Sequence, residues 1–133
     1  MQIVSSKDRT SRKARSEWFT GSVWVDEIVT GTVPSRLRAF RVSFEPGART
    51  AWHTHPVGQT LHVVTGTGLV QLASEPVRTI QPGDTVMIAP GERHWHGAAP
   101  GNTMVHLAMQ EADEAGVDVV WLEPVSDAEY SAR

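Results

Sequence analysis

The chain has 133 residues, a length that suits one compact domain. Hydrophobic residues make up 40% of it and charged residues 20%, which is typical of a globular protein and not of a disordered or fibrous one. The absence of cysteine excludes disulfides, thiolate nucleophiles, iron–sulfur clusters and cysteine-ligated zinc. A net charge of −3 argues against nucleic acid as a partner, because phosphate binding needs a clustered positive field.

The two ends of the chain differ in composition from its middle. Residues 1–16 are rich in Ser, Lys and Arg, and we interpret them as a solvated N-terminal arm. Residues 17–125 are expected to form the folded body, and residues 126–133 a short helix or a frayed tail. No apolar run approaches the roughly 20 residues that span a bilayer, and no secretory signal precedes the body, so we expect a cytoplasmic protein without a membrane partner.

The body contains many short segments that are rich in Val, Thr, Ile and Trp and are separated by Gly, Pro, Asn or Asp. This pattern predicts an all-β sandwich or barrel, since helical periodicity is scarce. The expected strands are 22–28, 38–44, 51–55, 60–64, 68–72, 85–88, 94–97, 103–108 and 117–122.

All six histidines lie between His53 and His106. Residues i and i+2 of a strand face the same side, so His53 and His55 should share one face, as should His94 and His96. Several strands could thus direct imidazoles into one barrel mouth, where nitrogen and oxygen ligands would suit a divalent metal. His62 has the opposite parity to Gln59 and is expected to face away from this site.

These residues resemble the two motifs of the cupin family. Gly47, His53, His55, Gln59 and Gly66 match every spacing of the first cupin motif, with Gln in place of the usual Glu. The second motif is met by Gly83, Gly91 and His94, with Ala89 at its first Pro position and Ala98 at its Asn position. The resemblance implies a single-domain cupin, a jelly-roll β-barrel with short N- and C-terminal extensions.

A closer resemblance covers nearly the whole chain and is to the small bacterial cupins that act as manganese-dependent hydroxynitrile lyases. It is carried by residues 18–21, 44–56, 58–61, 90–92, 94–100, 106–108 and 110–111, and in that subgroup both departures from the general motifs are normal. By this resemblance the metal ligands would be His53, His55, Gln59 and His94. Mn²⁺ is the expected ion, with Fe, Ni, Co or Zn as alternatives, and a homodimer or homotetramer is the expected assembly.

The reaction that this resemblance implies is cleavage of a cyanohydrin, such as mandelonitrile, into an aldehyde and hydrogen cyanide. We choose His96 as the base, because its parity with His94 keeps it in the same cavity and an imidazole titrates near neutral pH. His106 and Gln110 are expected to orient cyanide or the substrate oxygen. An apolar wall is expected from the alternating residues Phe40, Val42 and Phe44.

Two other classes of function stay open at this level. One keeps the metal but changes the reaction, to a dioxygenase on Fe(II) or an isomerase of a small oxygenated metabolite. The other is a non-enzymatic cupin that binds a metal or a small molecule. The fold alone does not choose among them, since barrels of this kind carry many chemistries.

Overall fold

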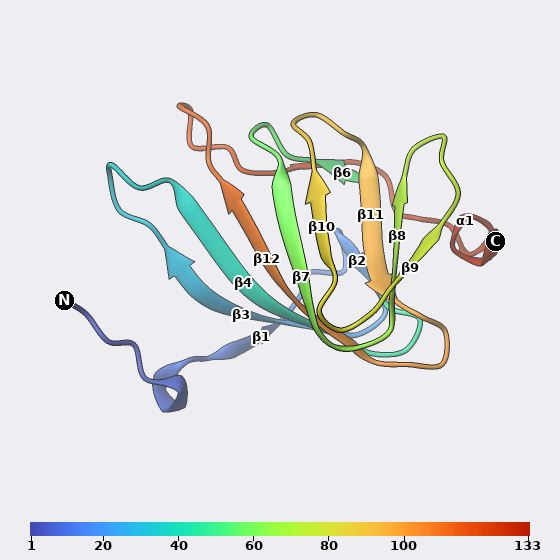
Figure 1. Ribbon diagram of the computed structural model, residues 1–133, viewed down its shortest axis with the longest axis horizontal. Helices are drawn as coiled ribbons and strands as arrows, with labels where there is room; N and C mark the ends of the chain where they lie inside the picture. Colours follow the sequence, from blue (N-terminus) through green and yellow to red (C-terminus); the bar gives the residue numbers. More distant parts are fainter.

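In the computed structural model, which describes residues 1–133, two antiparallel β-sheets face each other and form a barrel (Figure 1). The all-β jelly-roll prediction is therefore confirmed. The six-stranded sheet has the order β1 (Ser11–Lys13), β3 (Val23–Thr30), β4 (Leu37–Phe44), β12 (Met104–Glu111), β7 (Gln59–Gly66) and β10 (Thr85–Ile88). The second sheet has the order β13 (Val120–Trp121), β6 (His53–Thr54), β11 (His94–Ala98), β5 (Arg49–Thr50) and β2 (Phe19–Thr20), and β8 (Gly68–Leu72) pairs with both β11 and β9 (Arg78–Ile80).

The inward face of β12 changes from apolar to polar along the strand. Met104, His106, Ala108 and Gln110 alternate inward and are buried, as the two-residue period of a strand requires. Met104 belongs to the main hydrophobic core together with Phe44 and residues of β7. One end of the barrel is thus closed by apolar packing, and the polar residues lie toward the other end.

The predicted strand 51–55 is interrupted in the structure. Only His53 and Thr54 lie in a strand, β6, whereas Ala51, Trp52 and His55 lie outside strands and β5 already ends at Thr50. The backbone of Trp52 exchanges hydrogen bonds with the chain at Leu122 and Glu123, at 2.8 and 2.9 Å, and so binds the C-terminal segment. β6 is consequently placed between β11 and β13, with His53 opposite both His94 and Trp121. The sequence patterns also missed β1, β2, β5 and β9.

Both ends of the chain contain secondary structure. In the segment interpreted as an arm, η1 (Ser6–Asp8) is followed by β1, which pairs with β3 and so extends the sheet beyond the predicted boundary at residue 16. At the other end, residues 127–131 form the helix α1 (Asp127–Ser131), which begins with a capping box at Ser126. The buried Tyr130 donates a hydrogen bond to the carbonyl of Ala98 at 2.7 Å and joins a second core cluster with Trp52 and Trp95.

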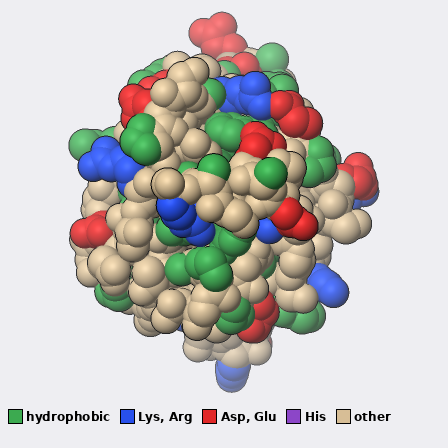
Figure 2. All heavy atoms as spheres, turned by 90° about the vertical axis from the view of Figure 1, so that its right-hand side faces the viewer, with side chains coloured by type: hydrophobic (Ala, Val, Ile, Leu, Met, Phe, Trp, Pro, Cys, Tyr) green, Lys and Arg blue, Asp and Glu red, His purple; other side chains and the backbone are tan.

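The outer surface mixes charges of both signs. Figure 2 shows the face beside α1, where Lys and Arg side chains are interspersed with Asp and Glu side chains and with hydrophobic ones. None of the helices has the length and apolar character that crossing a membrane requires.

Two motif glycines have nearly the same backbone angle but different surroundings. The φ angle is +79° at Gly47 and +80° at Gly66, in the left-handed region that glycine tolerates best. A Cβ on Gly66 would lie 1.9 Å from the carbonyl oxygen of Thr103, whereas a Cβ on Gly47 would have no heavy atom within 4 Å. Gly66 therefore meets two demands, a backbone angle and a close approach of two chain segments.

We expect Gly66→Ala to destabilise the barrel more than Gly47→Ala does. Both variants carry the cost of a left-handed alanine, roughly 1–2 kcal/mol. Gly66→Ala adds overpacking against backbone atoms, about 1–3 kcal/mol. Urea denaturation of the two variants measures the difference in the free energy of unfolding, and equal losses would contradict the close approach at Thr103.

Candidate metal centre

A cavity of about 470 Å³ opens between the two sheets. Its polar lining includes His53, His55, Gln59, His96 and His106, contributed by both sheets and the loop after β6. Its apolar lining comes partly from Phe40, Val42 and Ala108 on β4 and β12, and partly from Trp18, Phe19 and Trp121, where the rings of Trp18 and Trp121 are stacked 5.4 Å apart. The cavity is therefore a small chamber in which imidazoles lie beside apolar side chains, as His106 does opposite Val42 and His53 does against Trp121.

Three of the imidazoles are held in one tautomer by the backbone. The Nδ1 atoms of His53, His55 and His94 lie 2.9, 2.6 and 2.9 Å from the carbonyl oxygens of Ala51, Asp118 and Glu92, respectively. A carbonyl only accepts, so each Nδ1 must carry the hydrogen and donate it. The Nε2 atom of each neutral ring is then left with a lone pair, which is the form that binds a metal.

The three rings converge on one region. The ring centroids lie 4.2 Å apart for His53 and His94, 5.0 Å for His53 and His55, and 5.5 Å for His55 and His94. Nε2 of His55 is buried and has no hydrogen-bond partner. A buried polar atom without a partner is costly, and a bound cation would satisfy it.

Gln59 completes this set with an oxygen atom. Its Oε1 lies 3.2 Å from Nε2 of His94, while its Nε2 donates to Gln110 at 3.0 Å. Because Nδ1 of His94 carries the hydrogen, these two facing atoms are both acceptors. Two acceptors directed at each other repel unless a cation lies between them, so the donor set fits a divalent metal.

A second triad of histidines shares two members with the first. The candidate ligand atoms of His53, His94 and His96 all lie within 4.8 Å of one another, and all three residues are buried. Nε2 of His96 also has no hydrogen-bond partner. His96 differs from the other three imidazoles, however, because its Nδ1 lies 2.9 Å from Nε2 of His106 and not near a carbonyl. The hydrogen between these two atoms can lie on Nδ1 of His96 or on Nε2 of His106. The backbone therefore does not fix the tautomer of His96.

Burial keeps all five of these histidines neutral. Desolvation is the main cause that lowers the pKa of His53, His55 and His96 below the usual value, and it lowers the pKa of both His94 and His106 to about 4. Neighbouring imidazoles add to the effect for His53 and His96, because like charges would repel. At neutral pH every ring is consequently able to act as a ligand or as a proton acceptor.

The structure divides the predicted apolar wall. Phe40 and Val42 line the cavity, whereas Phe44 lies behind two imidazoles, with ring centroids 6.1 Å from His96 and 5.2 Å from His106. All three residues have the same parity on β4, but Phe44 pairs with Met104 at the closed end of the barrel. This is a correction to the predicted wall, because position along the barrel axis decides which residue meets the cavity.

The structure also shows where His62 and Gln110 lie, and it identifies cavity-lining residues that the sequence did not indicate. His62 lies outside the cavity, where its Nδ1 is 3.0 Å from Oγ1 of Thr85. Gln110 lines the cavity with its amide engaged by Gln59 and Asp118. Sequence reasoning missed Thr50, Asp118 and residues 12–15 as lining residues, since none belongs to the histidine motifs.

Comparisons with known proteins identify the family and the fold. The profile of the cupin domain matches residues 40–110. The chain is 48% identical to the (R)-mandelonitrile lyase of Granulicella tundricola over 130 residues, which cover 98% of each chain. It is 41% identical to a cupin-like protein from Thermotoga maritima, with a TM-score of 0.83 and 89% of each chain covered. The polyketide cyclase RemF from Streptomyces resistomycificus, at 21% identity and a TM-score of 0.73 over 98% of this chain and 90% of its own, shares the fold. On the profile match and the near-complete relative, the chain belongs to the cupin family.

Proposed function

We propose that this cupin is a metal-dependent hydroxynitrile lyase that cleaves a cyanohydrin such as mandelonitrile into an aldehyde and hydrogen cyanide. The observation that carries the proposal is the cavity itself, which is lined by histidines whose Nε2 atoms are free to bind a metal, by His96 with an unpartnered Nε2, and by apolar side chains. The relative named as an (R)-mandelonitrile lyase supports the same reaction and the R configuration of the substrate.

The proposed ligands are His53, His55, Gln59 and His94, and the proposed ion is Mn²⁺. When bound, a divalent cation supplies Lewis acidity toward the hydroxyl oxygen of the cyanohydrin. The three imidazoles and the carboxamide are all neutral, so they leave the charge of the ion uncompensated. A carboxylate at position 59 would reduce that charge.

His96 is the proposed base. Its Nε2 is buried without a partner in the wall of the cavity, and its Nδ1 contacts His106. In the proposed step, Nε2 of His96 takes the hydroxyl proton, the O–H electron pair forms the carbonyl, and the carbon–carbon bond breaks with its pair on cyanide. His96 then returns the proton to cyanide, which leaves as hydrogen cyanide.

His106 holds His96 in place for this transfer. When His96 gains a proton on Nε2, its Nδ1–H can donate to Nε2 of His106 across the 2.9 Å contact, which stabilises the imidazolium. Phe44 packs against both rings and limits their rotation. The phenyl group of mandelonitrile is proposed to lie against Phe40, Val42 and Ala108, since pockets for small ligands are lined mostly by apolar side chains.

One prediction concerns the reaction itself. Protein loaded with Mn²⁺ should release cyanide from (R)-mandelonitrile, and His53→Ala should abolish both metal binding and cyanide release, because His53 is common to both histidine triads. Metal analysis and a colorimetric cyanide assay measure the two outcomes, with circular dichroism as the check on folding.

Equal cyanide release by the two proteins from several cyanohydrins would refute the lyase. Oxygen consumption with phenols, in the absence of cyanide release, would favour the dioxygenase alternative instead. His62→Ala is the matched control, because His62 lies outside the cavity.

A further prediction separates a base from a ligand at position 96. His96→Ala should retain the metal at the level of the unmodified protein and lose about 10²-fold or more in turnover, since a general base contributes about 10²–10⁴-fold. Metal content is measured by inductively coupled plasma spectrometry and turnover by the cyanide assay. Loss of the metal from His96→Ala would assign His96 to the coordination shell.

A further inference from the structure

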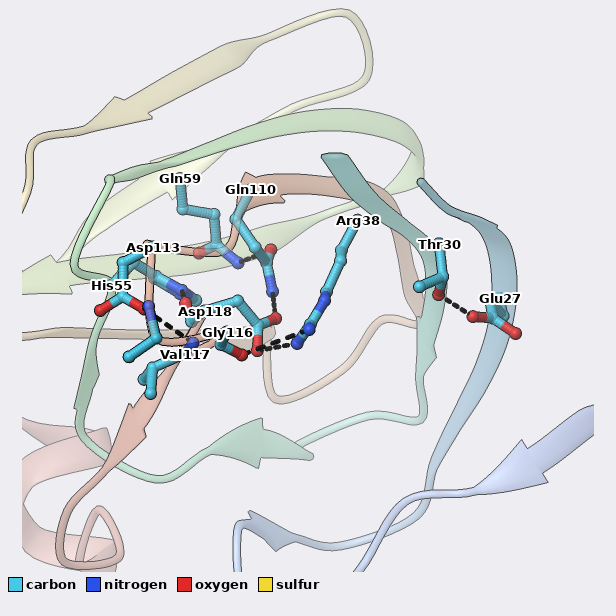
Figure 3. Close-up of polar contacts among 11 residues, drawn as sticks. Glu27, Thr30, Arg38, His55, Gln59, Gln110, Asp113, Gly116, Val117 and Asp118 are labelled. Carbon is cyan, nitrogen blue, oxygen red and sulfur yellow. Dashed lines mark hydrogen bonds and ion pairs between the residues drawn. The ribbon is translucent and has the colours of Figure 1, made fainter. Parts of the chain in front are cut away.

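A row of three polar side chains crosses the six-stranded sheet beside the proposed metal site. Gln110 of β12 lies directly opposite Arg38 on β4 and directly opposite Gln59 on β7. Directly opposite residues of antiparallel strands project from the same face of the sheet. Figure 3 shows Asp118, from the loop before β13, reaching this row between Arg38 and Gln110.

These side chains form one unbroken series of hydrogen bonds. Nη1 of Arg38 donates to Oδ1 of Asp118 at 2.7 Å, and Nε2 of Gln110 donates to Oδ2 of Asp118 at 3.0 Å. Nε2 of Gln59 donates in turn to Oε1 of Gln110 at 3.0 Å. Both glutamines and most of the Asp118 side chain are shielded from water, so solvent offers them few other partners.

The charged pair Arg38 and Asp118 determines which group donates and which accepts in every hydrogen bond of the series. A guanidinium can only donate and a carboxylate can only accept. Gln110 must therefore present its NH₂ group to Asp118, which leaves its oxygen for Gln59. Gln59 must then present its own NH₂ group to Gln110, which leaves its oxygen directed at His94.

We infer that Asp118 is a positioning residue that orients the Gln59 amide, through Gln110, so that an oxygen and not an NH₂ group faces the metal. The orientation matters because the oxygen of an amide can coordinate a cation, whereas its NH₂ group is a donor that repels one. This inference rests on the proposed metal site but not on the proposed reaction.

The same residue also fixes a second proposed ligand. The backbone carbonyl of Asp118 accepts the hydrogen bond from Nδ1 of His55 at 2.6 Å. The loop that carries it is held by Asp113, whose side chain accepts from the backbone N–H groups of Ala115 and Val117, as Figure 3 shows for Val117. Substitution of the Asp118 side chain retains this carbonyl, so the effect on Gln59 can be tested by itself.

An isosteric substitution of Asp118 should exchange the donor and acceptor roles along the series of hydrogen bonds. In Asp118→Asn, Arg38 still requires an oxygen at the position of Oδ1, which places the NH₂ group of the asparagine against Gln110. Gln110 must then turn its oxygen toward residue 118 and its NH₂ group toward Gln59. Gln59 turns as well and presents NH₂ to the metal site.

We predict that D118N binds Mn²⁺ about 10- to 100-fold more weakly than the unmodified protein, the range typical when the partner of a metal ligand is lost. The double variant D118N/Q110E should recover the affinity, because a glutamate at position 110 accepts from both neighbours and restores the Gln59 orientation. Calorimetric titration with Mn²⁺ measures the affinities.

Co²⁺ absorption spectra decide between orientation and simple loss of charge. Removing a carboxylate weakens cation binding by electrostatics alone but leaves the ligand set intact. We expect the Co²⁺ spectrum of D118N to change and that of D118N/Q110E to match the unmodified protein. A D118N spectrum identical to that of the unmodified protein would overturn the inference, whatever the affinity, and so would a double variant that folds without recovery.

Two further variants serve as controls. Arg38→Met removes the anchor of the loop but leaves an acceptor-only carboxylate, so its Co²⁺ spectrum should be unchanged. An equal spectral change in Arg38→Met and D118N would show that Asp118 only anchors the loop. Asp127→Asn loses an ion pair of similar length, to Arg49 at 2.8 Å, away from the site. Failure of the lyase proposal alone would leave all these metal-binding results in place.

Discussion

Three imidazole rings in this barrel each donate a hydrogen bond from Nδ1 to a backbone carbonyl, and the site depends on that constraint. It fixes the tautomer of each ring and directs an Nε2 lone pair toward the same buried region. Two of the carbonyls belong to the residue two positions before the histidine, so the local chain path supplies them. The third is that of Asp118, which the C-terminal segment brings to His55 from 63 residues away along the sequence.

The sheet supplies the rest of the site through its register. Gln59, Gln110 and Arg38 lie in one row because β7, β12 and β4 are adjacent, and His106 lies nearer the closed end of β12. The apolar end below this row, with Phe44 and Met104, keeps the strands in register and supports the rings of His96 and His106. The apolar end of the barrel thus stabilises the fold, while the polar end carries the residues of the proposed site.

Much of this could be predicted from the sequence, because strand alternation is a local rule. It placed His53 with His55, and His94 with His96, on common faces, and it separated His62 from them. Alternation also grouped Phe44 with Phe40 and Val42. The three side chains do share one face of β4, but alternation does not tell how far along the barrel axis each one lies. Asp118 and Thr50 could not be found in this way, since they reach the cavity through packing of distant segments and carry no periodic signal.

We propose that Gln59 and three histidines with fixed tautomers hold the metal while His96 stays free to accept a proton. A crystal structure of the Mn²⁺-loaded protein with anomalous scattering data would locate the ion and identify its ligands. We expect bonds to the ion from Nε2 of His53, His55 and His94 and from Oε1 of Gln59, with Nε2 of His96 outside bonding distance. An ion bound by His53, His94 and His96, with Gln59 turned away, would contradict both the proposed ligand set and the role of His96 as the base.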